Sequence, residues 1–282
     1  GSAEDLAYVK DLLGSFTTSF STSSADRSKN VNSGAKHVNG TVLYPGETFS
    51  MYETVAPFTA ENGYAMAGSY LNGEVVDSMG GGICQVSTTL YNAVLRAELE
   101  VVERSPHSMT VHYVELSEDA AIAGTYKDFK FKNSTDYPIY IEGYTTSDKK
   151  ITFNIYGKET RDSNRSISFE SVLVNEVKPN TILRDDAGQG LGYKNVSAGK
   201  TGYVAELYKI VKVNGVQTDR IKINKSTYKG SDRVVTYGTA GDPTLSENLR
   251  AAIAAQDEAL ADANVAAANA ANAAAAAAAP AQ

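Results

Sequence analysis

The only cysteine of this sequence, Cys84, is the residue best suited to covalent chemistry. It follows three consecutive glycines and precedes the run QVSTTLYNAVLRAEL, whose apolar residues recur at spacings of three and four. This periodicity predicts a helix that begins at or near Cys84. The positive end of a helix dipole and its unpaired N–H groups stabilise a thiolate and a developing oxyanion. We therefore predict a nucleophilic thiol at Cys84, with Gly82 and Gln85 contributing to oxyanion binding.

A nucleophilic thiol needs a base, and His107 in RSPHSMTVHYV is the first candidate. If this run is a strand, His107 alternates with apolar residues and faces the core, whereas His112 faces outward. Asp128, on the next expected strand, is the natural group to orient the imidazole. Simple alternation instead puts Asn133 on the face of the neighbouring phenylalanines, so Asn133 is the alternative third residue.

A structural reading of the same residues stays open. A lone cysteine is most often a small buried apolar residue. His107 would then be a hydrogen-bonded histidine at a strand end, and Asp128 a surface charge beside two lysines. Tyr91, with Tyr52 and Tyr70, could line a substrate cleft or pack in the core.

The composition narrows the classes of partner. The formal net charge of -7 opposes binding to a phosphate backbone, which requires clustered Lys and Arg, so we expect no nucleic-acid partner. One cysteine and three histidines leave too few soft ligands for a zinc cluster, and we expect no metal and no cofactor. No run approaches the roughly 20 apolar residues that span a bilayer, so we expect no transmembrane segment.

The first large part of the chain mixes helix and strand signals. Gly1 and Ser2 read as a remnant of cloning, so residues 1–10 are expected to be scar and lead-in. Within 11–158, a helix is expected over Asp26 to Val38, and alternating strand-like runs follow the cysteine helix: SMTVHYV, YKDFKFKN, YPIYIEGY and KKITFNIYG. These features predict an α+β domain of helices and antiparallel sheet.

The second part of the chain has a different pattern. The polar stretch 159–166 is the expected linker. Residues 167–240 carry strand-like runs around Asn214-Gly215, a strong hairpin signal, and predict a smaller, elongated all-β domain. Residues 241–282 form an Ala/Asn-rich low-complexity tail, which we expect to be a spacer with frayed helix, because it lacks large side chains for docking.

A family resemblance covers residues 11–158. The succession VNGTVLYPGETFS, ENGY, GGGICQVSTTLYNAVLRAELEVVERSPHSMTVHYV, DAAI and DFKFKNSTDYPIYI resembles the VanW family, named for an accessory gene product of glycopeptide-resistance clusters. This resemblance implies an exported or surface-anchored bacterial protein of the cell wall, and it supplies no catalytic residues. The chain order of thiol, histidine and polar group is also similar to that of papain-like, NlpC-like and transglutaminase-like enzymes, and fold alone does not fix function.

A second resemblance covers the all-β part. Gly199, Gly202, Asn214-Gly215 and the closing TyrGlyThr at 237–239 are similar to the five-glycine domain of Gram-positive surface proteins. The resemblance implies recognition of glycans that contain N-acetylglucosamine, or an elongated adhesive spacer.

Together these features predict a cell-wall cysteine hydrolase or transpeptidase that acts on peptidoglycan stem peptides. We expect it to be extracellular, at the wall or surface of a Gram-positive bacterium, with peptidoglycan or wall glycan as its partner. One alternative is a non-catalytic module that binds peptidoglycan or glycan, and another is an adhesive stalk. A thiol and an imidazole that meet in an open cleft would favour the enzyme.

Overall fold

A computed structural model describes residues 2–71 and 74–278 of the chain, without the side chains of residues 70, 71 and 74. The expected place of Tyr70 in a cleft therefore lies outside the described side chains. Two compact units are each formed from two stretches of the chain. The first unit comprises Gly1–Asn175 and Tyr203–Lys229, and the second comprises Glu176–Gly202 and Gly230–Gln282.

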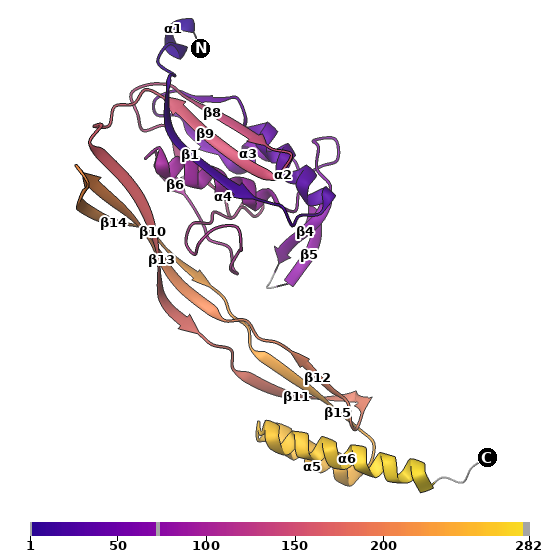
Figure 1. Ribbon diagram of the computed structural model, residues 1–282. Coiled ribbons are helices and arrows are strands. Elements are labelled where there is room, and N and C mark those ends of the chain that lie inside the picture. Colours follow the sequence, from indigo (N-terminus) through magenta and orange to yellow (C-terminus); the bar gives the residue numbers. More distant parts are fainter. Residues whose placement is uncertain (1, 72–73, 279–282) are drawn as a thin grey trace. The chain divides into compact units, whose positions relative to one another are not determined.

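The first unit is built on a four-stranded antiparallel sheet with the order β1-β9-β8-β2. Its strands are β1 (Asp11–Ser19), β9 (Lys150–Gly157), β8 (Ile139–Thr145) and β2 (Thr41–Leu43). Two helices, α2 (Ala25–Val38) and α4 (Ile83–Arg96), pack against this sheet (Figure 1). Both helices were expected from the sequence, α2 to within a residue, and the α+β class is confirmed.

Smaller elements complete the first unit. A three-stranded antiparallel sheet has the order β3-β7-β6, and β4 pairs with β5 as a hairpin. The bounds are β3 (Thr48–Ser50), β7 (Lys130–Lys132), β6 (Glu100–Glu103), β4 (Met66–Leu71), β5 (Glu74–Met79), α1 (Ala3–Leu6) and α3 (Met51–Val55). The strand expected over SMTVHYV is wrong, because residues 104–122 form an irregular loop.

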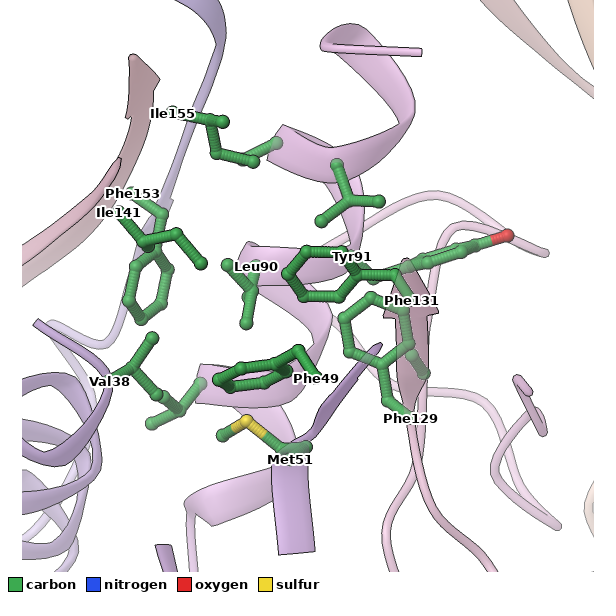
Figure 2. Close-up of a cluster of buried hydrophobic side chains, with 14 of the residues drawn as sticks. Val38, Phe49, Met51, Leu90, Tyr91, Phe129, Phe131, Ile141, Phe153 and Ile155 are labelled. Carbon is green, nitrogen blue, oxygen red and sulfur yellow. The ribbon is translucent and has the colours of Figure 1, made fainter. Parts of the chain in front are cut away.

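The main core lies between α4 and the two sheets (Figure 2). Leu90 on α4 is fully buried, as are Phe153 and Ile141 of the large sheet and Phe131 of the small one. Burial of each such side chain stabilises the fold by about 1.5–3 kcal/mol. The apolar residues that recur at spacings of three and four in α4 therefore form a buried face of the helix. Burial of this face holds the helix and its N-terminal residues in position.

The expected linker is held by ion pairs. Glu98, just after α4, accepts hydrogen bonds from Arg161 at 3.2 Å, Arg165 at 2.7 Å and Lys209 at 2.9 Å. Its carboxylate is only 12% exposed. Burial raises the pKa of Glu98, but the hydrogen bonds and charges of these cations outweigh it and lower the pKa to about 2. The polar stretch 159–166 is therefore tied to the first unit.

The third sheet has the order β10-β13-β14. Its strands are β10 (Arg165–Val177), β13 (Gly202–Val213) and β14 (Val216–Tyr228). Asn214 and Gly215 join β13 to β14 with φ values of 52° and 79°, which confirms the predicted hairpin turn. Arg104 and Ser117 hydrogen-bond to Ser226 and Tyr228 of β14, and nearly all of β10, β13 and β14 belongs to the first unit, so the compact units divide the strands differently from the boundary expected at residue 167.

The second unit consists of a sheet and two helices. The sheet has the order β11-β15-β12, in which β11 is parallel and β12 antiparallel to β15. The bounds are β11 (Thr181–Gly190), β12 (Lys194–Ser197), β15 (Arg233–Ala240), α5 (Pro243–Ala254) and α6 (Glu258–Ala278). Figure 1 shows the two helices side by side.

The tail is a docked helical pair over most of its length, so the expectation of an undocked spacer is wrong. Leu249 and Val265 are buried in one cluster with Val235 and Tyr237 of β15. Arg233 donates to both carboxylate oxygens of Glu258, at 2.7 and 2.9 Å. The few large side chains of the tail are spaced so that they contact the sheet. The small alanine side chains allow the two helices to pack closely.

Candidate active site

The three glycines before Cys84 have separate structural roles. Gly80 and Gly82 have φ values of 82° and 106°, which disfavour any residue with a side chain. A Cβ on Gly81 would lie 2.3 Å from the carbonyl oxygen of Ala67 on β4. The backbone therefore turns sharply from β5 into α4, and Cys84 becomes the second residue of the helix.

Cys84 and His107 come together in the first unit. The half-buried Cys84 sulfur lies 3.4 Å from the carbonyl oxygen of Ile122, and the imidazole of His107 forms a hydrogen bond with the sulfur. His107 Nδ1 is 2.7 Å from Asp119 Oδ2. Because Nδ1 is engaged in this way, Nε2 is the ring nitrogen left to face the thiol.

Asp119 is the carboxylate that orients His107. Its Oδ2 also accepts the backbone N–H of His107 at 2.7 Å. Its Oδ1 accepts hydrogen bonds from Arg104 at 3.3 Å and from the hydroxyl of Tyr228, whose oxygen in turn accepts the Ser117 N–H at 2.8 Å. Asp119 is 1% exposed and both of its oxygens are bound, so the imidazole has one fixed orientation.

Asp128 and Asn133 do not orient His107, and the choice of Asp128 is wrong. The Asp128 carboxylate accepts hydrogen bonds from the Ser50 hydroxyl at 2.5 Å and the Tyr52 N–H at 2.9 Å, at the start of α3. Asn133 is buried and donates to the carbonyls of Leu43, at 2.9 Å, and Tyr137, at 2.8 Å. Both side chains form hydrogen bonds with backbone groups in and around the small sheet. Strand alternation therefore did not predict which side chain contacts His107.

The pKa values of the pair move in opposite directions. Burial lowers the pKa of His107, but its hydrogen bond to Asp119 and its interaction with Cys84 outweigh burial and raise the pKa to about 9. Burial raises the pKa of Cys84, but the hydrogen bond and charge of His107 outweigh it and leave the pKa below its usual value. Burial also raises the pKa of Asp119, and the bond and charge of His107 reverse this. The three groups favour thiolate, imidazolium and carboxylate together.

A cleft of about 530 Å³ opens in front of the thiol. Cys84 and His107 both line it, so the pair faces a space large enough for part of a substrate. Its apolar walls come from β5, the start of α4, the segment after α3 and the loop 104–122: Phe58, Val75, Val76, Met79, Ile83 and Ile122. His112 is exposed, as expected, and it also lines the cleft.

Comparison with known families identifies both parts of the chain. The family model described as VanW like protein matches residues 26–156, and the model of the G5 domain matches residues 170–240. Residues 26–156 are therefore similar to the VanW-like family, and we refer to them as the VanW-like domain. The two resemblances found in the sequence are confirmed, and this combination of domains indicates a cell-wall-associated protein.

Two curated relatives are similar to about half of this chain. A protein of Bacillus subtilis (strain 168), the uncharacterized protein YoaR, is 41% identical over 140 residues, which cover 49% of this chain and 46% of that protein. The vancomycin B-type resistance protein VanW of Enterococcus faecalis (strain ATCC 700802 / V583) is 31% identical over 134 residues, 45% of this chain and 48% of that protein. The chain thus spans about half the length of these relatives, at 46% and 48%.

Two solved structures resemble the G5 part. The G5 domain of IgA1 protease has a TM-score of 0.23 at 22% identity, and covers 27% of this chain and 94% of its own. The structure of HP0197-G5 has a TM-score of 0.18 at 22% identity, and covers 27% of this chain and 100% of its own.

Two residues of the VanW-like domain expected at the site have structural roles. Gln85 is among the residues that line the cleft, but its side chain is fully buried and its amide donates to Thr18 and Ser19, both at 2.9 Å, so these N–H groups are already engaged. Tyr91 is 1% exposed in the core and accepts a hydrogen bond from Asn224 at 2.8 Å. Gly82 does line the cleft, at the helix start.

The backbone offers a different oxyanion donor. The N–H groups of Ile83 and Gln85 donate to the carbonyls of Gly80 and Gly82, both at 3.1 Å. Among the first three N–H groups of α4, that of Cys84 is therefore the candidate donor to a group bound at the sulfur. Tyr52 is not among the residues that line the cleft. Its ring packs edge-on against Phe58, which does line the cleft, with ring centroids 6.2 Å apart.

Sequence reasoning missed Asp119 and Tyr228 of the His107 network. Asp119 directly precedes the apolar run AlaAlaIle, and a carboxylate beside a buried run is a signal that could have marked it. No signal connects Tyr228, which is 109 residues further along the chain, to Asp119.

Two features are absent from the part of the chain that the structure describes. None of the helices in this part is both long and apolar enough to cross a bilayer. In residues 2–71 and 74–278, no three or more His, Cys, Asp or Glu side chains are grouped so that they could hold a metal ion.

Proposed function

We propose that this chain is a cell-wall cysteine enzyme that hydrolyses or transfers acyl groups of peptidoglycan stem peptides. The observation that carries the proposal is the pairing of Cys84, at a helix start in an open cleft, with His107, whose other nitrogen is bound by the buried Asp119. In this arrangement a base contacts the nucleophile and an orienting group contacts the base, as covalent acyl transfer requires.

In the proposed reaction, the Cys84 thiolate attacks the carbonyl carbon of a stem-peptide amide and a C–S bond forms. The C–N electron pair leaves with the amine, which takes a proton from the His107 imidazolium. Water, or an acceptor amine in a transferase, then attacks the thioester and gives its proton to His107 as the thiolate departs. Asp119 keeps Nδ1 engaged throughout, so Nε2 remains the nitrogen that exchanges the proton.

The helix start supports the charged intermediate. The oxyanion formed at the substrate carbonyl would lie beside the N-terminus of α4, where the Cys84 N–H is the candidate donor. The raised pKa of His107 and the lowered pKa of Cys84 both favour the thiolate–imidazolium pair. A thiolate is the reactive form of a cysteine nucleophile.

We assign the G5 domain the task of holding the enzyme on wall glycan. This assignment follows from the domain match at residues 170–240 and is independent of the Cys84 chemistry. The two curated relatives come from Bacillus subtilis and Enterococcus faecalis, which supports an extracellular site at a Gram-positive wall.

Digestion of purified peptidoglycan sacculi tests the proposal. The full chain is incubated with sacculi, new amino groups are counted, and released peptides are identified by mass spectrometry. We expect wild-type protein to change the amide bonds of the stem peptides, and Cys84→Ala protein to bind the sacculi without changing them. If wild-type and Cys84→Ala proteins both pellet with sacculi and neither changes an amide bond, the chain is a binding module and the enzymatic proposal is wrong.

A further inference from the structure

The cleft in front of Cys84 has a charge opposite to that of the whole chain. The chain has 33 acidic and 26 basic residues. Yet Arg27 and Lys127 line the cleft with two histidines, and none of its described lining residues is Asp or Glu. The nearby Asp119 lies behind His107, bonded by Arg104 and the imidazole, so its charge is largely compensated.

Arg27 is fixed at the glycine turn. One of its nitrogens, Nη1, donates to Ser23 at 2.7 Å and to Gln85 Oε1 at 2.9 Å. A Cβ on Gly82 would lie 2.9 Å from Arg27 Cγ, so the side-chain stem packs on the turn itself. Both described bonds use Nη1, which leaves Nε and Nη2 as donors for a bound group.

Lys127 supplies a second positive charge close to the base. Its ammonium donates to the Pro106 carbonyl at 3.3 Å, directly before His107 in the chain. An ammonium has three N–H donors, so others stay available for a ligand. The start of α4, at Ile83, adds the positive end of a helix dipole to the same cleft. The walls between these charges are apolar.

We propose that the Cys84 cleft takes an acyl substrate that carries a carboxylate beside an apolar portion, and that Lys127 and Arg27 bind this carboxylate. The inference rests on the proposed function, since it names the substrate class of the same site. An anionic group gains attraction from both cations, whereas an amine at this position would be repelled. The apolar walls bind the portion next to the carboxylate.

Two alkylating reagents of nearly equal size test the charge preference. Iodoacetate and iodoacetamide both form a bond between carbon and the Cys84 sulfur while iodide leaves, and they differ in negative charge. The ratio of their rates is independent of the thiolate fraction, because the same thiolate attacks both. N-acetylcysteine amide is the reference thiol without a cleft.

We expect the full chain to favour iodoacetate over iodoacetamide, relative to the reference thiol. Lys127→Gln should lower the iodoacetate rate relative to the iodoacetamide rate by about three- to tenfold. The matched control Lys132→Gln removes a lysine that is 40% exposed on β7 and does not line the cleft, so it should leave the ratio unchanged.

The outcomes separate the two proposals. If Cys84 reacts with both reagents in the folded chain and Lys127→Gln leaves the ratio at the wild-type value, the carboxylate inference is wrong and the nucleophile stands. If Cys84 reacts with neither reagent until the chain is unfolded in urea, the proposed function fails and this inference fails with it.

Discussion

Replacement of Asp119 by Asn is the sharpest test of the network behind the thiol. This substitution keeps the shape of the side chain and removes the charge that His107 faces at 2.7 Å. The corresponding change at Asp128 removes an equally buried carboxylate, at 7% exposure, that contacts the start of α3 instead. The pair therefore compares two buried carboxylates, of which Asp119 contacts His107 and Asp128 does not.

The magnitude follows from the pKa of His107. A rise from the ordinary 6.5 to about 9 corresponds to about 3 kcal/mol in favour of the imidazolium. Asp119 is the largest of the groups that raise this pKa, and Cys84 supplies part of the remainder. We expect Asp119→Asn to lower the pKa of His107 by about 1–2 pH units, and to slow Cys84 alkylation at pH 7 about tenfold.

The assay is the rate of iodoacetamide alkylation of Cys84 as a function of pH, with the His107 pKa followed by NMR of its ring protons. Near-ultraviolet circular dichroism verifies that each variant is folded. Asp128→Asn should keep the wild-type pH profile, even if its melting temperature falls. A folded Asp119→Asn protein with an unchanged profile, or a larger shift in Asp128→Asn, would refute the assignment of Asp119.

Three other perturbations have defined outcomes. Tyr228→Phe removes a hydrogen bond to Asp119, and urea unfolding should show a loss of about 1–3 kcal/mol together with slower Cys84 alkylation. Gly81→Ala forces a Cβ against β4, and the same assay should show a loss of about 1–3 kcal/mol. Glu98→Gln should cost about 2 kcal/mol at pH 7. Because the pKa of Glu98 is lowered to about 2, this stabilisation is present above pH 4.5 and disappears as the pH falls through 2, so the variant and wild type should converge there.

Local patterns in the sequence determined a large part of the fold. The three-and-four spacing in α4 identified the buried helix, and Asn214-Gly215 identified the β13–β14 turn, because each depends on neighbours along the chain. The same locality placed Cys84 at a helix start. His107, the predicted base, does contact Cys84, although the strand that was expected to position it is a loop.

The third member of the site was decided by tertiary structure alone. A loop of residues 104–122 has no periodicity from which side-chain direction can be read, and its conformation is set by hydrogen bonds of Arg104, His107 and Asp119. Tyr228 reaches Asp119 only because β14 belongs to the first unit, together with the loop that carries Asp119. A short local pattern can fix a helix and its first residues, whereas contacts between distant segments depend on how those segments pack.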